Sequence, residues 1–206
     1  MASQMMIFDT KSDGFYMAVG PYYAARQNIY HFYDDFSKQP ELFMPAVPIE
    51  PVVEKAAQIE NRLISKNEKL KAFTELAQQY KEDANVQFLV AYKAFRLSRM
   101  DIFADYAQRA FTITPSNSEY QMYAGLAAFQ KQDMGKAISL LDGVIARYPE
   151  QDLIRLTVLE RASAVRSPQK AAQYKTQKQE ILYTYGAESY YNSELLPLIN
   201  ALEKAK

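Results

Sequence analysis

Hydrophobic residues follow a helical period over most of the chain, from Ile49 to the C-terminus. Apolar side chains recur three and four positions apart, which is typical of amphipathic helices that pack against a common core. Prolines, glycines and short polar runs divide this region into pieces of helix length. We therefore predict helices over these approximate ranges: 50–66, 68–81, 84–98, 101–113, 117–131, 134–147, 151–165, 168–184 and 192–204.

The last of these helices has the clearest division between an apolar and a polar side. Leu195, Leu198, Ile199 and Leu202 fall on one stripe, and Ser193 stands where it can cap the helix. We predict a C-terminal capping helix over residues 187–206.

Two short apolar runs near the N-terminus predict a β-hairpin. They are Met5–Thr10 and Phe15–Val19, and they flank Lys11–Gly14. The Asp-Gly pair in that connection is typical of a turn.

The stretch after this hairpin predicts an aromatic-rich helix from Pro21 to about Ser37, because proline is tolerated in a first helical turn. Its aromatic residues fall on nearly every side, so it needs cover on more than one face. We select these residues as the interface of an N-terminal arm: Tyr22, Tyr23, Tyr30, Phe32, Tyr33 and Phe36.

Prolines are concentrated between this arm and the helical region. Pro40, Pro45, Pro48 and Pro51 disfavour helix and strand alike, and they predict an extended linker. We expect the arm and linker to occupy residues 1–48.

Two further prolines, Pro115 and Pro149, lie 34 residues apart and end segments of the same design. Helix-turn-helix repeats of this length cannot bury their apolar faces alone and therefore stack. The same offset relates these pairs: Ala91 and Gly125, Ala94 and Ala128, Phe95 and Phe129, Met100 and Met134.

The unit that ends at Pro149 resembles the tetratricopeptide (TPR) consensus. The matching stretches are Ala124–Phe129, Gln132–Ile138 and Arg147–Pro149. In that family a small residue on the first helix packs against an alanine on the second, here Ala137. The resemblance extends to units at 50–83, 84–117, 118–151 and 152–185. It implies an all-α, right-handed solenoid of three to four units over residues 49–186.

Composition agrees with a helical protein and excludes several chemistries. The chain has 206 residues, of which 49% are hydrophobic, and only six glycines for tight turns. Its formal net charge is zero, so no overall field attracts nucleic acid or an anionic membrane. The absence of cysteine excludes disulfides, thiolate metal sites and cysteine catalysis.

No apolar stretch reaches the roughly 18 residues needed to span a bilayer, so we expect no direct membrane insertion. The first nine residues lack the basic start and apolar core of a signal peptide. If Met1 is the native start, the expected location is the cytoplasm.

The N-terminal acids do not make a convincing calcium site. Asp9, Asp13 and Gly14 are placed as in an EF-hand loop, but Lys11 replaces a ligand and Gly20 replaces the bidentate glutamate. We therefore interpret this stretch as a plain turn.

His31, the only histidine, lies near Asp34 and Asp35. A lone histidine among aromatic residues is more often packed or exposed than catalytic, and adjacent aspartates on a helix point in different directions. The sequence has no phosphate-binding loop, nucleophile elbow or paired metal-ligand histidines. We predict no catalytic residue, cofactor or metal.

The TPR resemblance implies a groove lined by the first helix of each unit. Carried over position by position, it places an apolar ladder there rather than the lysines and asparagines that bind a carboxylate tail. If the units are tightly coiled, or if the register is off by one residue, this ladder is instead part of the core. The groove residues are Phe88, Tyr92, Phe95, Arg96, Met122, Leu126, Phe129 and Gln130.

We therefore expect a non-enzymatic interaction module, such as an adaptor, assembly factor or chaperone, that binds an apolar segment. The segment is either the chain's own N-terminal arm or part of a partner protein. The alternative is a structural subunit of a larger assembly that docks through the arm, and the arm could equally be exchanged between copies of the chain.

Overall fold

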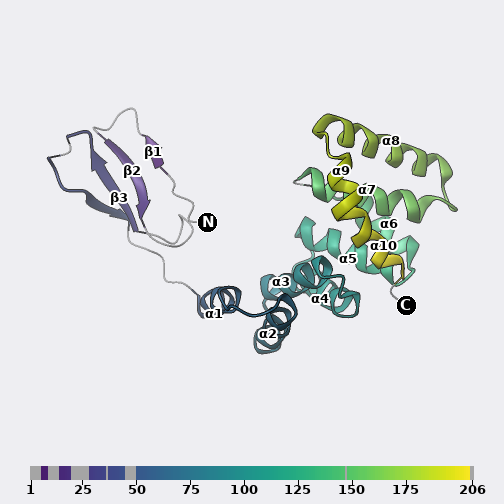
Figure 1. Cartoon of the computed structure of the whole chain (residues 1–206), viewed down its shortest axis with the longest axis horizontal. Coiled ribbons are helices and arrows are strands. Elements are labelled where there is room, and N and C mark those ends of the chain that lie inside the picture. The colour runs from purple at the N-terminus through teal and green to yellow at the C-terminus, as the bar shows by residue number, and fades with distance from the viewer. Residues whose placement is uncertain are drawn as a thin grey trace. The chain divides into compact units, whose positions relative to one another are not determined.

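A computed structural model describes residues 6–8, 14–19, 28–35, 37–44, 50–146 and 148–204 (Figure 1). The chain divides into two units, Met1–Ala57 and Gln58–Lys206. Helix α1 (Pro51–Glu60) spans the boundary between them.

The described strands of the first unit form an antiparallel sheet in the order β1-β2-β3-β4. The first two strands pair with Phe8 opposite Phe15, which confirms the predicted hairpin. The four strands are β1 (Met6–Phe8), β2 (Gly14–Val19), β3 (Asn28–Tyr33) and β4 (Glu41–Met44).

The predicted helix from Pro21 to Ser37 is wrong over β3, which pairs with β2 on one edge and β4 on the other. This strand is rich in β-branched and aromatic residues, which fit a pleated surface. Successive side chains of a strand point to opposite faces, so a sheet accommodates aromatic residues that no single helix face could bury. The description of the chain as all-α therefore fails for this unit.

The proline-rich stretch is also partly strand. β4 lies between Pro40 and Pro45 and forms the end of the described sheet, where flanking prolines are tolerated. Pro51 begins α1, whereas Pro45 and Pro48 lie outside the described residues.

The rest of the chain is helical, as predicted, and consecutive helices from α2 to α8 pack against each other. The predicted boundaries agree closely for most of them. The helices are α2 (Lys66–Gln79), α3 (Ala84–Arg96), α4 (Met100–Ile113), α5 (Ser118–Gln130), α6 (Met134–Asp142), α7 (Pro149–Ser163), α8 (Pro168–Tyr185), α9 (Glu188–Tyr190), the π-helix η2 (Tyr191–Leu195) and α10 (Leu196–Lys204).

The 34-residue offset recurs in the backbone at the helix ends. Asp83 and Asn117 each cap a helix by accepting hydrogen bonds from the backbone N–H groups two and three positions later. Ser98 and Gln132 each end a helix with a positive φ, of 55° and 61°. In both turns the next residue donates its N–H to a carbonyl five positions earlier, at 2.8 and 3.0 Å. The α3–α4 and α5–α6 pairs therefore share their turn geometry.

Close approach of α5 and α6 requires a glycine. A Cβ atom at Gly125 would lie 2.6 Å from Cγ of Leu141, well inside normal contact distance. Leu141 and Ala137 are fully buried on the facing helix. A residue without a side chain at position 125 therefore allows α5 and α6 to pack closely.

Helices α5 and α7 are buried on nearly all sides. Every residue from Met122 to Phe129 is buried, and so is every residue from Leu156 to Leu159. A helix that is apolar all round must be covered all round. The C-terminal helix α10 supplies part of this cover because it packs on both α5 and α7 (Figure 1).

Candidate protein-binding pocket

A pocket of about 330 Å³ opens where α3, α5 and α7 meet. We call it the aromatic pocket. It is lined by side chains of these three helices and by the residue that precedes α7. The lining residues are Phe88, Tyr92, Glu119, Tyr123, Tyr148, Glu150, Gln151 and Ile154.

Aromatic rings from α3 and α5 form the inner wall of the pocket. The Phe88 ring meets the Tyr123 ring edge to face, with centroids 5.0 Å apart. The Tyr92 ring lies 6.4 Å from Phe88 and 6.3 Å from Tyr123. Tyr123 is buried whereas Tyr92 is 41% exposed, so the wall runs from the core to solvent.

The hydroxyl of Tyr123 is held in its neutral form. Burial raises its pKa far above the ordinary value of 10.0, and nearby negative groups, Glu119 and Glu150 among them, raise it further. The innermost ring of the pocket is therefore a neutral phenol at physiological pH.

Two carboxylates lie at the pocket, and their surroundings differ. Glu150 accepts a hydrogen bond from Arg96 on α3 at 2.9 Å, and its second oxygen accepts one from the Tyr190 hydroxyl at 2.9 Å. Glu119 accepts a hydrogen bond from the Gln151 amide at 3.0 Å. The charge of Glu150 is thus balanced by a guanidinium, whereas that of Glu119 faces an uncharged amide.

One stripe of α7 connects the pocket to the C-terminal helix. Its residues are spaced i, i+4, i+7 and i+11: Glu150, Ile154, Thr157 and Arg161. The first two line the aromatic pocket. The other two contact the C-terminal segment, so the same side of α7 is open at one end and covered at the other.

Polar contacts fix the covered end. The Thr157 and Tyr191 hydroxyls lie 3.0 Å apart, and Arg161 donates to the Asn200 side chain at 3.0 Å. Arg161 also pairs with Glu203 at 2.9 Å. The C-terminal segment is therefore held to α7 along the length of η2 and α10.

Apolar burial accompanies these contacts. Leu195, Ile199 and Leu202 have no exposed surface, and Leu198 is also buried. The apolar stripe predicted for the C-terminal helix is confirmed as a buried stripe.

The structure separates the predicted groove residues into three groups. Phe88 and Tyr92 line the aromatic pocket, and Arg96 lies beside it through its bond to Glu150. Gln130 is half-buried and donates to the Met100 carbonyl at 3.0 Å.

Four predicted groove residues are core residues instead. Phe95, Met122, Leu126 and Phe129 are at most 1% exposed, so the prediction that they line an open groove is wrong. On α5 the register is displaced by one residue, because Tyr123 rather than Met122 lines the pocket. Leu126 continues the stripe of Tyr123 but is fully buried on a helix that α10 helps to cover.

Sequence reasoning missed the other lining residues: Glu119, Tyr123, Tyr148, Glu150, Gln151 and Ile154. A signal was present for four of them, since Glu119 and Tyr123 on α5, and likewise Glu150 and Ile154 on α7, are spaced i, i+4 near the start of a helix. Because α7 begins at Pro149, its first turn reaches the pocket earlier than a strict 34-residue register allows.

The aromatic residues chosen for the N-terminal arm fall into two sets. Tyr30, Phe32 and Tyr33 are half-buried on β3. Tyr22, Tyr23 and Phe36 lie outside the described residues.

The residues weighed for other chemistry have structural roles where they are described. The His31 ring packs edge-on against Tyr33, with centroids 4.6 Å apart. Asp35 accepts hydrogen bonds from Ser37, which hold the pKa of its carboxyl below the ordinary value. Gly14 belongs to β2, and the aspartates considered for calcium lie outside the described residues. Within the described part of the chain, no group of three or more His, Cys, Asp or Glu could hold a metal ion.

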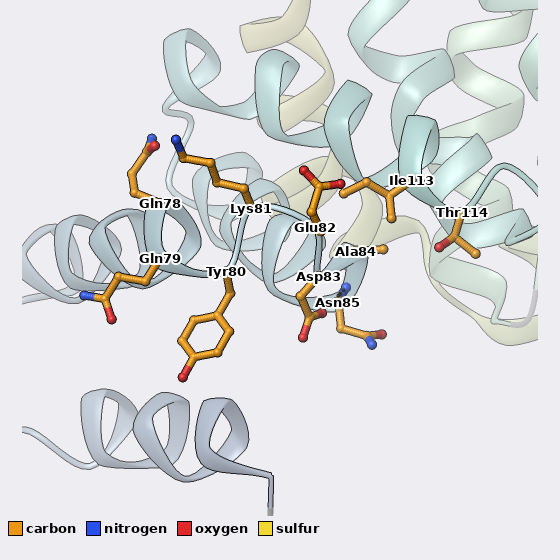
Figure 2. Close-up of a pocket in the computed structure, with 10 residues that line it drawn as sticks. All are labelled: Gln78, Gln79, Tyr80, Lys81, Glu82, Asp83, Ala84, Asn85, Ile113 and Thr114. Carbon is orange, nitrogen blue, oxygen red and sulfur yellow. Dashed lines mark hydrogen bonds between the residues drawn. The ribbon is translucent and has the colours of Figure 1, made fainter.

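A larger, more polar pocket of about 850 Å³ lies around the α2–α3 connection and the end of α4 (Figure 2). Three of its polar side chains hold the fold together. Asp83 caps α3, the Asn85 side chain accepts a bond from Tyr120 at 2.7 Å, and Gln78 donates to Tyr106 at 3.0 Å. These hydrogen bonds stabilise the α2–α3 connection. The aromatic pocket is therefore the stronger candidate for a binding site.

Comparison with known proteins adds no relative: no protein-family profile matches the chain, and no curated protein matches it. Among the described helices, none is long and apolar enough to cross a bilayer.

Proposed function

We propose that this protein is a TPR-like interaction module that binds a short segment of a partner protein in the aromatic pocket. The observation that carries the proposal is the pocket itself, whose walls come from α3, α5 and α7. In the resemblance to TPR proteins these are the first helices of successive units, and first helices line the binding groove in that family.

The repeated turns support the TPR-like assignment. Positive φ at Ser98 and Gln132, and caps at Asp83 and Asn117, recur at the repeat offset of 34 residues. Gly125 occupies the small position that lets two helices approach. We propose that the helices from α2 to α8, which pack consecutively, continue this geometry as a solenoid of three to four units.

Binding rather than catalysis fits the chemistry of the pocket. Half-exposed aromatic rings with a few polar groups are typical of recognition surfaces, where aromatic residues contribute much of the binding energy. The Glu150 carboxylate is bonded to Arg96 and Tyr190, so it serves to fix the pocket wall.

The proposal is tested by capture of the partner with variants of the full chain. Tyr92→Ala should reduce capture from an extract of the source organism at least tenfold, as expected when an interface aromatic residue that contributes about 2 kcal/mol is truncated. Tyr183→Ala is the matched control, because Tyr183 is 91% exposed on α8. Equal capture by both variants would exclude the pocket as the binding site.

A second candidate function is that of a structural subunit that docks through the sheet of the first unit. By strand register, Phe15, Met17, Tyr30, Phe32 and Leu42 share one face of the sheet, and none of them is buried. Phe15 and Phe32 stack with centroids 5.3 Å apart. Apolar faces of this kind are typical of interfaces.

Two exposed leucines distinguish the candidates. Leu42 is 54% exposed on the sheet and Leu63 is 104% exposed after α1. If the sheet docks, Leu42→Lys should abolish co-purification with the assembly, while Leu63→Lys and Tyr92→Ala retain it. Loss with Tyr92→Ala alone would favour the aromatic pocket.

A further inference from the structure

The geometry points to a more specific ligand for the aromatic pocket: the cationic side chain of a lysine or arginine in the partner segment. This inference rests on the proposed function and adds the chemistry of the bound group. Its basis is the combination at one site of aromatic rings, limited volume and a carboxylate that pairs with no basic side chain of the described residues.

Four of the lining side chains are aromatic: Phe88, Tyr92, Tyr123 and Tyr148. The faces of such rings are electronegative and attract ammonium and guanidinium groups. Tyr92 and Tyr148 are 41% and 63% exposed, so a ligand can reach their rings from solvent. The phenol of Tyr123 remains neutral because burial raises its pKa, and its ring contributes without charge.

The carboxylates make the pocket negative. Among the described residues that line it, two are acidic and none is basic. Arg96 balances Glu150 from outside the lining, at 2.9 Å. No described lysine or arginine nitrogen pairs with Glu119, whose carboxylate accepts a hydrogen bond from the Gln151 amide. A cation in the pocket would supply the missing counter-charge.

The size of the pocket favours one long side chain. Its volume of about 330 Å³ lies at the small end of the range for ligand pockets, roughly 300 to 1,000 Å³. Phe88 is half-buried and offers apolar surface for the methylene stem of a lysine or arginine, whose charged group would then lie near the tyrosine rings and Glu119.

The test measures binding of small probes to the full chain by amide chemical shifts. The cationic probes are Nα-acetyl-arginine and Nα-acetyl-lysine N-methylamides. Their neutral counterparts are the citrulline derivative, which matches arginine in shape, and the norleucine derivative, which keeps the methylene stem of lysine and lacks its ammonium group. We expect each cationic probe to bind about fivefold to tenfold more tightly than its counterpart, with shifts centred on Phe88, Tyr92, Glu119 and Gln151.

Two variants identify the source of this preference. Glu119→Gln should reduce the cationic preference several-fold while leaving the affinity for norleucine unchanged. Tyr92→Leu keeps an apolar side chain but removes a ring, and should weaken the cationic probes more than the neutral ones. Glu180→Gln, on the exposed part of α8, is the control for a change of net charge and should have no effect.

The outcomes separate this inference from the proposed function. Equal binding of cationic and neutral probes, or no shifts up to the solubility of the cationic probes, overturns the inference, while capture that still depends on Tyr92 preserves the proposed function. Cation-selective binding together with Tyr92-independent capture overturns partner recognition and assigns the pocket to a free small cation. Cation-selective binding that falls with Glu119→Gln, together with Tyr92-dependent capture, supports both.

Discussion

The two ends of the α7 stripe differ in what covers them. At the start of α7, Glu150 is partly exposed and, with the buried Ile154, lines a pocket that has half-exposed rings. One to two turns later, Thr157 and Arg161 contact the chain's own C-terminal segment. One helix face thus serves a solvent-accessible pocket at one end and a permanent intramolecular contact at the other.

This difference indicates how residues of similar chemistry acquire different roles. Leu126 and Tyr123 lie on one stripe of α5, yet Leu126 is fully buried whereas Tyr123 lines the pocket. Helix α10 packs on α5 and α7 and so enlarges their core. The residues that it helps to cover contribute to stability rather than to binding. We expect substitutions at the covered end to change unfolding and substitutions at the open end to change binding.

The largest effect on stability is expected at the covered end. Ile199→Ala removes a fully buried side chain on α10 and should lower the free energy of unfolding by about 2 to 4 kcal/mol, because burial is lost and a cavity remains. Urea denaturation measures this change. Ile145→Ala is the matched control, since Ile145 is 84% exposed and its loss should cost less than about 0.5 kcal/mol. Equal effects would show that α10 is not part of the core.

A somewhat smaller loss of stability is expected where α5 packs against α6. Gly125→Ala places a Cβ atom against the buried Leu141 side chain and should destabilise by about 1 to 3 kcal/mol. Gly143→Ala meets no atom within 4 Å and should be neutral or slightly stabilising. Thermal unfolding of the two variants compares them directly, and a neutral Gly125→Ala would argue against the close α5–α6 approach.

The polar contact between α7 and η2 should contribute about 1 kcal/mol. Thr157→Val and Tyr191→Phe each remove one hydroxyl of the pair that lies 3.0 Å apart. Their effects on unfolding should be less than additive in a double-mutant cycle, because both remove the same interaction. Full additivity would mean that the hydroxyls do not interact.

The smallest effect on stability at neutral pH is expected at Tyr123, the innermost ring of the aromatic pocket. Tyr123→Phe should change stability little at pH 7 because the ring packing is retained. The folded-state pKa of Tyr123 lies above the unfolded value of about 10, so its stabilising contribution is present below that pH and is lost as pH rises above it. Unfolding at several alkaline pH values should therefore show a shallower loss of stability for Tyr123→Phe than for the parent chain. Identical slopes would contradict the burial of this phenol.

Much of the helical fold could be predicted because its signals are local. Each signal lies in or next to the helices that it predicts. Examples are the spacing of Pro115 and Pro149 and the apolar stripe of Leu195, Leu198 and Ile199. The strand at Asn28–Tyr33 could not be separated from a helix in this way, because its aromatic residues satisfy both patterns until pairing with β2 and β4 is known.

The binding site was harder to predict because it depends on contacts between distant segments. Phe88 and Tyr92 follow from the repeat, but Glu150 joins them only because α7 starts at Pro149. The burial of Leu126 depends on how the helices around α5 pack, and α10, which follows it by about 70 residues, is one of them. A repeat pattern describes contacts between neighbouring units, and it does not indicate that a later helix packs back against an earlier one.

Site-specific photo-crosslinking tests most directly whether the open end of the α7 stripe, at the aromatic pocket, is a binding site. A benzophenone side chain replaces Tyr92 at the aromatic pocket, and in a second chain it replaces Tyr183 on the exposed surface of α8. Both chains are irradiated in an extract of the source organism, and the cross-linked segments are sequenced. We predict one recurrent partner segment, carrying a lysine or arginine, at position 92 and none in common at position 183. The same products at both positions, or none at position 92, would contradict the account.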